Sequence, residues 1–165
     1  MIDEESELIQ MIQTYQDDFY RLCLTYVKDS MTAMDIVQDA IVKAMLNYHK
    51  LKSKEYLKTW FYRILINECK LYIRKKKFTE PFYETSFSSP TTDIHTTLEV
   101  QEMIEKLPLK YKDIIYLRYY EDMSLLEISQ VLHMNVNSVK TRLYKALDIL
   151  KADWEKGSDD GCYNK

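Results

Sequence analysis

Apolar side chains recur at intervals of three and four residues along most of the chain, which is the period of a helix with one buried face. In the first 78 residues this pattern predicts helices near residues 8–26, 30–45 and 56–77. We expect Ser30 or Thr32 to cap the second of them, because a hydroxyl can accept from the unpaired amides of a first turn. Residues 47–56, NYHKLKSKEY, lack the period and are interpreted as a basic loop.

The same period returns near Thr97, pauses at Leu107 and Pro108, and resumes beyond them. Ser124 and Glu127 have the spacing of a capping box and should open a short helix. A turn at residues 133–134 follows, and Asn135 should cap a final helix. The apolar stripe of that helix faces a core, and it consists of Val139, Leu143, Ala146, Leu147 and Leu150.

A short helix, a tight turn and a second helix with a polar leading end form a helix-turn-helix arrangement. His133 stands at the turn position where glycine is usual, so it must adopt a positive φ at some cost. Ser129 supplies the small residue that the crossing of the two helices favours. The alternative is an ordinary amphipathic helix whose basic face is merely solvated.

The only glycines, Gly157 and Gly161, lie near the end of the chain, so tight hairpins and glycine-rich phosphate loops are excluded. We therefore predict an all-α protein with two small helical domains, the second of which contains the helix-turn-helix. The domains should span residues 1–78 and 97–155, joined by a flexible, acidic linker rich in Ser, Thr and Pro at 79–96. Residues 156–165 are expected to form a frayed tail.

Charge is segregated along the chain although the net charge is only -3. Residues 1–39 carry nine acids and two bases, whereas residues 50–77 carry ten bases and two acids. No lysine or arginine occurs between residues 78 and 105. This distribution favours a protein that meets a polyanion with some surfaces and repels it with others.

No catalytic or metal-binding pattern is present. His49, His95 and His133 fall in the loop, the linker and the turn, without the spacing of metal ligands or a nearby nucleophile signature. Cys23 and Cys69 lie on apolar helix faces, which favours buried packing thiols over redox sensing. We expect no enzymatic activity, cofactor, metal or small-molecule substrate.

The N-terminus, MIDEESELIQ, is acidic and lacks the features of a signal peptide, and no run of about 18 apolar residues occurs. A cytoplasmic location is the expectation.

The third predicted helix ends in RKKK and also carries Trp60, Tyr62, Arg63 and Asn67. Aromatic rings among cations suit single-stranded or opened DNA, because bases leave the stack only if other π faces receive them. The alternatives are that Trp60 and Phe61 belong to the core and that RKKK is a solvated helix end.

In this order, these features resemble the extracytoplasmic-function sigma factors, the compact two-domain group of the sigma-70 family. The segments that carry the resemblance are DIVQDAIVKAM (35–45), LKTWFYRILINECKLYIRKKK (57–77), IEKLPLKYKDIIYLRYYEDMSLLEIS (104–129) and NVNSVKTRLYKALDILK (135–151). Such proteins bind core RNA polymerase and direct it to promoters. Two departures are that Ile41 stands where an aromatic is usual, and that the base-capturing loop varies too much to assign a base.

The resemblance implies three sets of contacts. Contacts to the clamp of core RNA polymerase fall on Asp35, Gln38 and Asp39. Contacts to the start-proximal promoter element, where one base is flipped, fall on Asn47, Tyr48, His49, Lys50, Lys52, Lys54, Trp60, Arg63, Asn67, Lys70 and Arg74. Contacts to the upstream element in the major groove fall on Asn137, Ser138, Lys140, Thr141, Arg142, Tyr144 and Lys145.

The resemblance also implies an anti-sigma factor as a partner, in many members membrane-anchored, although no residue here establishes one. The main alternative is a free-standing helix-turn-helix regulator that binds duplex operator DNA without polymerase, with residues 1–78 for dimerisation or sensing. An adaptor that occupies polymerase without contacting DNA is a third reading.

Overall fold

The structure is a computed structural model that describes residues 2–79 and 98–160. The described residues are helical almost throughout and form no strand, which confirms the all-α prediction. The chain divides into two compact units between residues 92 and 93. Most of the predicted linker, residues 80–96, lies outside the described residues. None of the described helices is long and apolar enough to cross a membrane.

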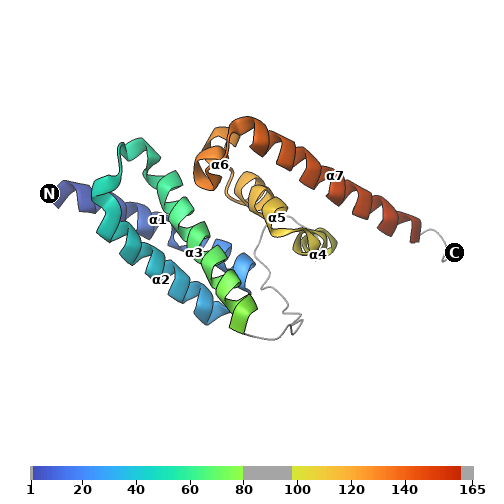
Figure 1. Ribbon diagram of the computed structural model, residues 1–165, viewed down its shortest axis with the longest axis horizontal. Coiled ribbons are helices and arrows are strands. Elements are labelled where there is room, and N and C mark those ends of the chain that lie inside the picture. The colour runs from blue at the N-terminus through green and yellow to red at the C-terminus, as the bar shows by residue number, and fades with distance from the viewer. Residues whose placement is uncertain (1, 80–97, 161–165) are drawn as a thin grey trace. The chain divides into compact units, whose positions relative to one another are not determined.

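The first unit is a three-helix bundle in which each helix packs against the other two (Figure 1). Its centre is aromatic: the ring centroid of Phe19 lies 4.5 Å from that of Phe61 and 5.1 Å from that of Tyr62, and all three side chains are fully buried. The elements are α1 (Ile2–Val27), α2 (Ser30–Asn47), the short 3₁₀ turns η1 (Tyr48–Lys50) and η2 (Lys54–Tyr56), and α3 (Leu57–Thr79).

The cap of α2 is Asp29, so the prediction of Ser30 or Thr32 was wrong. The Oδ2 atom of Asp29 accepts from the Thr32 amide at 2.9 Å and from the Thr32 hydroxyl at 2.6 Å. These bonds to Thr32 hold the pKa of the Asp29 carboxyl below its usual range. The physical reason is the turn before it, since Lys28 takes φ 57° at the end of α1 and leaves Asp29 extended at the start of α2.

The predicted packing role of the two helical cysteines is confirmed. Cys23 of α1 and Cys69 of α3 are both buried, and the Cys69 thiol donates to the Cys23 sulfur over 3.5 Å. The bond to Cys69, together with burial, raises the pKa of the Cys23 thiol. A protonated, buried thiol is a poor nucleophile, so this pair acts as core.

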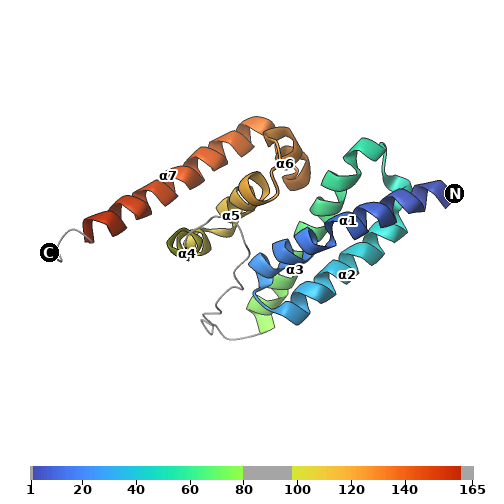
Figure 2. The same cartoon turned by 180° about the vertical axis from the view of Figure 1, so that it is seen from behind.

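In the residues that the structure describes, the second unit contains four α-helices and one π-helical turn. Figure 2 shows α4, α5, α6 and α7 from behind. The predicted pause at Leu107 and Pro108 is confirmed. The last helix continues to Asp160, past residue 155, where we expected the tail to begin, because α4 packs along it. The elements are α4 (Leu98–Lys106), α5 (Leu109–Ile115), the π turn η3 (Tyr116–Tyr120), α6 (Leu125–Leu132) and α7 (Val136–Asp160).

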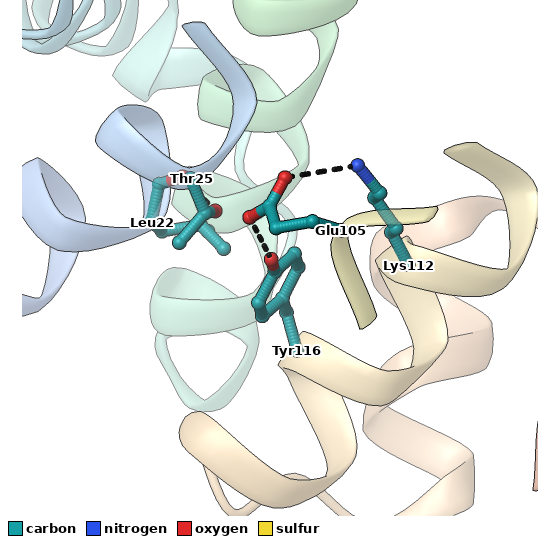
Figure 3. Close-up of polar contacts among 5 residues, drawn as sticks. All are labelled: Leu22, Thr25, Glu105, Lys112 and Tyr116. Carbon is teal, nitrogen blue, oxygen red and sulfur yellow. Dashed lines mark hydrogen bonds and ion pairs between the residues drawn. The ribbon is translucent and has the colours of Figure 1, made fainter. Parts of the chain in front are cut away.

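A polar link fixes α4 against α5 and η3, as Figure 3 shows. One carboxylate oxygen of Glu105, Oε2, lies 3.2 Å from the Lys112 ammonium, and the other, Oε1, accepts from the Tyr116 hydroxyl at 3.1 Å. Both ionic side chains are mostly buried, and burial followed by the charge of Glu105 raises the pKa of Tyr116. The bend at Pro108 is therefore closed by a charge-assisted clasp.

The helix-turn-helix has the local bonds that its sequence predicts. The Ser124 amide donates to Glu127 at 2.8 Å, and the Glu127 amide donates to the Ser124 hydroxyl at 3.2 Å, which completes the capping box. Asn135 accepts from the Ser138 amide at 2.7 Å and caps α7. His133 adopts φ 56° and ψ 49°, the left-handed conformation that the turn requires.

Replacing His133 by glycine should stabilise the second unit. A side chain at positive φ costs about 1–2 kcal/mol, and the greater unfolded-state entropy of glycine offsets part of the gain, so we expect about 0.5–1 kcal/mol. Urea denaturation of His133→Gly checks this. His133→Ala keeps the strain and should show no gain; equal behaviour of the two variants would contradict the explanation.

Candidate nucleic-acid and protein-binding surfaces

The predicted recognition residues lie together on the side of α7 away from its buried stripe. Val139, Leu143 and Ala146 are buried, as predicted. Asn137, Lys140, Thr141, Tyr144 and Lys145 are exposed, whereas Ser138 and Arg142 are half-buried at the edge of this face.

The side chains on this face suit contact with a groove of duplex DNA. The Lys140 ammonium lies 5.9 Å from the centroid of the Tyr144 ring, and the Thr141 hydroxyl donates to the Asn137 carbonyl at 2.9 Å. Because no carboxylate stands among these residues between Asn135 and Ala146, the face is cationic and rich in hydrogen-bond donors. Such a helix can place side chains on phosphates and base edges of duplex DNA.

Several loop residues predicted to contact DNA are engaged within the protein. Asn47 donates to the Lys43 carbonyl at 2.8 Å and accepts from Lys50 at 2.7 Å. The Lys54 ammonium lies 2.9 Å from the Glu7 carboxylate of α1. The loop is therefore anchored at both ends, while His49 and Lys52 are exposed between the anchors.

The loop and the third helix meet through an aromatic contact. The rings of Tyr48 and Trp60 lie edge to face, with centroids 6.4 Å apart, and both side chains are half-buried. The sequence did not predict this pairing. It leaves two partly accessible π faces next to the exposed His49, a suitable setting for an unstacked base.

A continuous stripe runs along α3 from that aromatic pair. Its members recur at intervals of three and four residues, and Glu68, the one acid within α3, lies off the stripe and is paired with Lys43 of α2. Tyr62, which the sequence pattern grouped with these residues, is fully buried in the core, because it lies about 200° around the helix from Trp60. The stripe residues are Trp60, Arg63, Asn67, Lys70 and Arg74.

The outer face of α2 is more apolar than its sequence pattern suggested. Asp35, Gln38 and Asp39 are exposed, as predicted from the helical period. Around them stand five large apolar side chains that are 52–76% exposed. We call this set the α2 outer face; its apolar members are Met31, Met34, Val42, Met45 and Leu46.

The sequence did contain a signal for the α2 outer face, since its five apolar residues also follow the helical period. They were missed because the opposite face of α2 carries Ile36 and Val37 and seemed sufficient for a core. Exposed apolar groups in one stripe, bordered by carboxylates, mark a surface that another protein covers. Within the described ranges no group of three His, Cys, Asp or Glu side chains could hold a metal ion.

Each of the two units matches a known protein family. The family model "Sigma-70 region 2" matches residues 11–79, and "Sigma-70, region 4" matches residues 97–150. The chain is 36% identical to "RNA polymerase sigma factor SigV" of Bacillus subtilis, over 90% of this chain and 92% of that protein. It is 29% identical to "ECF RNA polymerase sigma factor SigW" of the same organism, over 90% and 89% respectively.

Two solved structures share the fold. The sigma factor RpoE of Bartonella quintana, solved with the anti-sigma factor NepR, gives a TM-score of 0.73 at 19% identity and covers 87% of this chain and 93% of its own. CnrH, solved with the cytosolic domain of CnrY, gives 0.68 at 18% identity and covers 90% and 88%.

The distinction between Trp60 and its neighbour Phe61 is testable by stability. Phe61→Ala should cost about 3–5 kcal/mol of unfolding free energy, because it empties the centre of the bundle. Trp60→Ala should cost only about 1 kcal/mol, the size of one aromatic pair with Tyr48. Chemical denaturation measures both, and equal losses would place Trp60 in the core.

Proposed function

The chain belongs to the extracytoplasmic-function group of the sigma-70 family and is an RNA polymerase sigma factor, and from this premise we propose a role for each of its surfaces. The α2 outer face binds the clamp of core RNA polymerase. The loop and the α3 stripe hold the unpaired start-proximal promoter element. The recognition face of α7 binds the upstream element as duplex. The observation that carries the proposal is that exposed apolar residues gather on α2, whereas exposed cationic residues gather on α3 with its preceding loop and on α7.

The α2 outer face fits a protein partner better than DNA. Covering its large apolar side chains stabilises a complex, by roughly 1.5–3 kcal/mol for each fully buried Val, Leu or Met. Asp35 and Asp39 repel phosphates and would pair with cationic side chains of the polymerase. Their place beside the apolar residues supports their predicted role in polymerase binding.

The loop and α3 fit a separated strand. Extruding a base costs a few kcal/mol, which the Tyr48–Trp60 ring pair can offset by stacking. Arg63, Asn67 and Lys70 extend from this pair in one line and supply charge and hydrogen bonds to the strand. Since Asn47 is held by the Lys43 carbonyl and the Lys50 side chain, and Lys54 by the Glu7 carboxylate, their contribution is to shape the loop before it contacts DNA.

An anti-sigma factor is the other proposed partner. The RpoE structure contains the anti-sigma factor NepR, and the CnrH structure contains the cytosolic domain of CnrY. For this chain we propose that such a partner covers the α2 outer face and so excludes polymerase; in many members of the family this partner is membrane-anchored. We also propose that the chain works in the cytoplasm, without catalysis, cofactor or small-molecule substrate.

Reconstituted transcription tests the proposal as a whole. The purified chain is mixed with bacterial core polymerase and genomic DNA fragments, and the 5′ ends of the transcripts are sequenced. We expect initiation at a set of sites that share two spaced elements and that are absent with core polymerase alone. Tight binding of duplex DNA by the chain alone, without polymerase-dependent transcripts, would instead support the free-standing regulator.

A charge placed on the α2 outer face should weaken polymerase binding. Met45→Glu or Val42→Glu buries an unpaired carboxylate in the proposed interface, and we expect at least about a tenfold loss of affinity for core polymerase. The matched control is Ile9→Glu, since Ile9 is a large apolar residue of α1 that is 45% exposed. Equal losses in all three variants would exclude the proposed face.

Substitutions in α7 should separate base reading from phosphate contact. If Tyr144 and Lys145 contact bases, alanine at either position should change the preferred upstream sequence at one or two positions, worth about 1–3 kcal/mol each. Sequencing of selected promoter libraries measures this. Lys151→Ala, further along the same helix, should leave the preference unchanged. A uniform loss of affinity across all promoter sequences would mean that Tyr144 and Lys145 contact only phosphates.

A further inference from the structure

Sulfur-containing side chains are unevenly distributed between the core and the surface. Among the methionines that the structure describes, only Met31, Met34 and Met45 are exposed, at 76%, 52% and 53%. All three belong to the α2 outer face, and the other described methionines are half-buried or buried. Cys23 and Cys69 are fully buried. In the described part of the chain, the sulfur that solvent reaches is therefore concentrated on α2.

The three α2 methionines, Met31, Met34 and Met45, form one line on the surface. At 3.6 residues per turn they fall within an arc of about 60°, and Met31 and Met45 stand about 21 Å apart along the helix axis. Gln38 falls inside the same arc. Helix formation does not call for sulfur at these positions, because leucine is equally apolar and has about the same helix propensity.

A thioether differs from other apolar side chains in its reaction with peroxides. The sulfur lone pair attacks one oxygen of hydrogen peroxide, the O–O bond breaks, and the proton of the transferred hydroxyl goes to the leaving hydroxide. The sulfur loses two electrons, the peroxide gains them, and the products are methionine sulfoxide and water. The side chain becomes polar, and reductases specific for each sulfoxide epimer reverse the change.

The charges around the α2 methionines favour a neutral oxidant. Asp35 and Asp39 are exposed on the same face and repel anions. Lys43, the one base of α2, is paired with Glu68 of α3. Hydrogen peroxide is uncharged at neutral pH, so these carboxylates do not keep it from the methionines.

We propose that the three α2 methionines form a reversible oxidation site, through which hydrogen peroxide lowers the affinity of the chain for core RNA polymerase. This inference rests on the proposed function, because it takes the α2 outer face as the polymerase-binding surface. A sulfoxide oxygen that is buried among apolar groups without a hydrogen-bond donor destabilises the complex. Oxidation of the three side chains should therefore weaken the complex about tenfold or more.

The first measurement locates the reaction. The purified chain is treated with hydrogen peroxide, catalase stops the reaction, and dithiothreitol then reduces any oxidised thiol but no sulfoxide. Peptide mass spectrometry gives the oxidation rate at each methionine. The three α2 methionines should react at least about five times faster than Met123, which is 3% exposed. Core polymerase that is bound before the treatment should protect them.

The second measurement is the dissociation constant of the complex with core polymerase, before and after peroxide. For the wild type it should rise about tenfold or more, and it should return when the oxidised chain is treated with reductases for both sulfoxide epimers. In M31L/M34L/M45L, which has no sulfur on this face, peroxide should leave the ratio of the two constants at one.

A matched control replaces the half-buried methionines instead. M11L/M103L/M134L keeps the three α2 methionines, so peroxide should weaken its complex with polymerase as much as that of the wild type. Circular dichroism shows whether each variant and the oxidised wild type are folded.

Three results would overturn the inference. Equal oxidation rates at the α2 methionines and at Met123 would mean that no selective site exists. An unchanged affinity of the oxidised wild type would mean that the interface tolerates the sulfoxides. A loss in M31L/M34L/M45L equal to that of the wild type would place the damage elsewhere in the chain.

Failure of the proposed function gives a different pattern. If the untreated chain does not bind core polymerase, or if bound polymerase leaves the α2 methionines unprotected, the α2 outer face is not the polymerase contact and this inference fails with it. If binding and protection are both observed and oxidation leaves the affinity unchanged, only the inference fails.

Discussion

The packing of Phe19 against Phe61 and Tyr62 determines which side of α3 the first unit exposes. These rings fix the rotation of α3, and a rotation by one residue would turn the helix by about 100° and bury part of the cationic stripe. The same core places Trp60 beside Tyr48 at its edge, because Trp60 precedes Phe61 on the helix. The exposed, cationic side of α3 is therefore a consequence of aromatic packing on its other side.

In the second unit, local hydrogen bonds rather than aromatic packing determine where the recognition helix lies. Its helix-turn-helix is set by short-range bonds, the Ser124–Glu127 box and the Asn135 cap, which fix where α6 and α7 begin. The Glu105 clasp to Lys112 and Tyr116 then holds α4 against α5, on which α7 packs. Local bonds thus define the recognition helix, and the clasp supports the body that carries it.

This difference explains how much the sequence could predict. The capping box, the Asn135 cap and the left-handed His133 follow from neighbours within five residues, and each was predicted correctly. The Tyr48–Trp60 contact and the Lys54–Glu7 pair depend on how helices meet, which periodicity does not specify. The site residues themselves stay predictions, although the structure brings each of the three sets to a surface or its edge.

The apolar outer face of α2 was not predicted from the sequence, and the residues on the buried side of the helix explain why. Its inward side is built largely from small residues, with Ala33, Ala40 and Ala44 fully buried, so α2 can approach the other two helices closely. Larger apolar residues then remain outside. On the proposed assignment that face has room for one partner at a time, since one stripe on one helix carries all its apolar groups. Polymerase and an anti-sigma factor would then compete, and whichever binds more tightly at its own concentration determines whether the two cationic surfaces reach DNA.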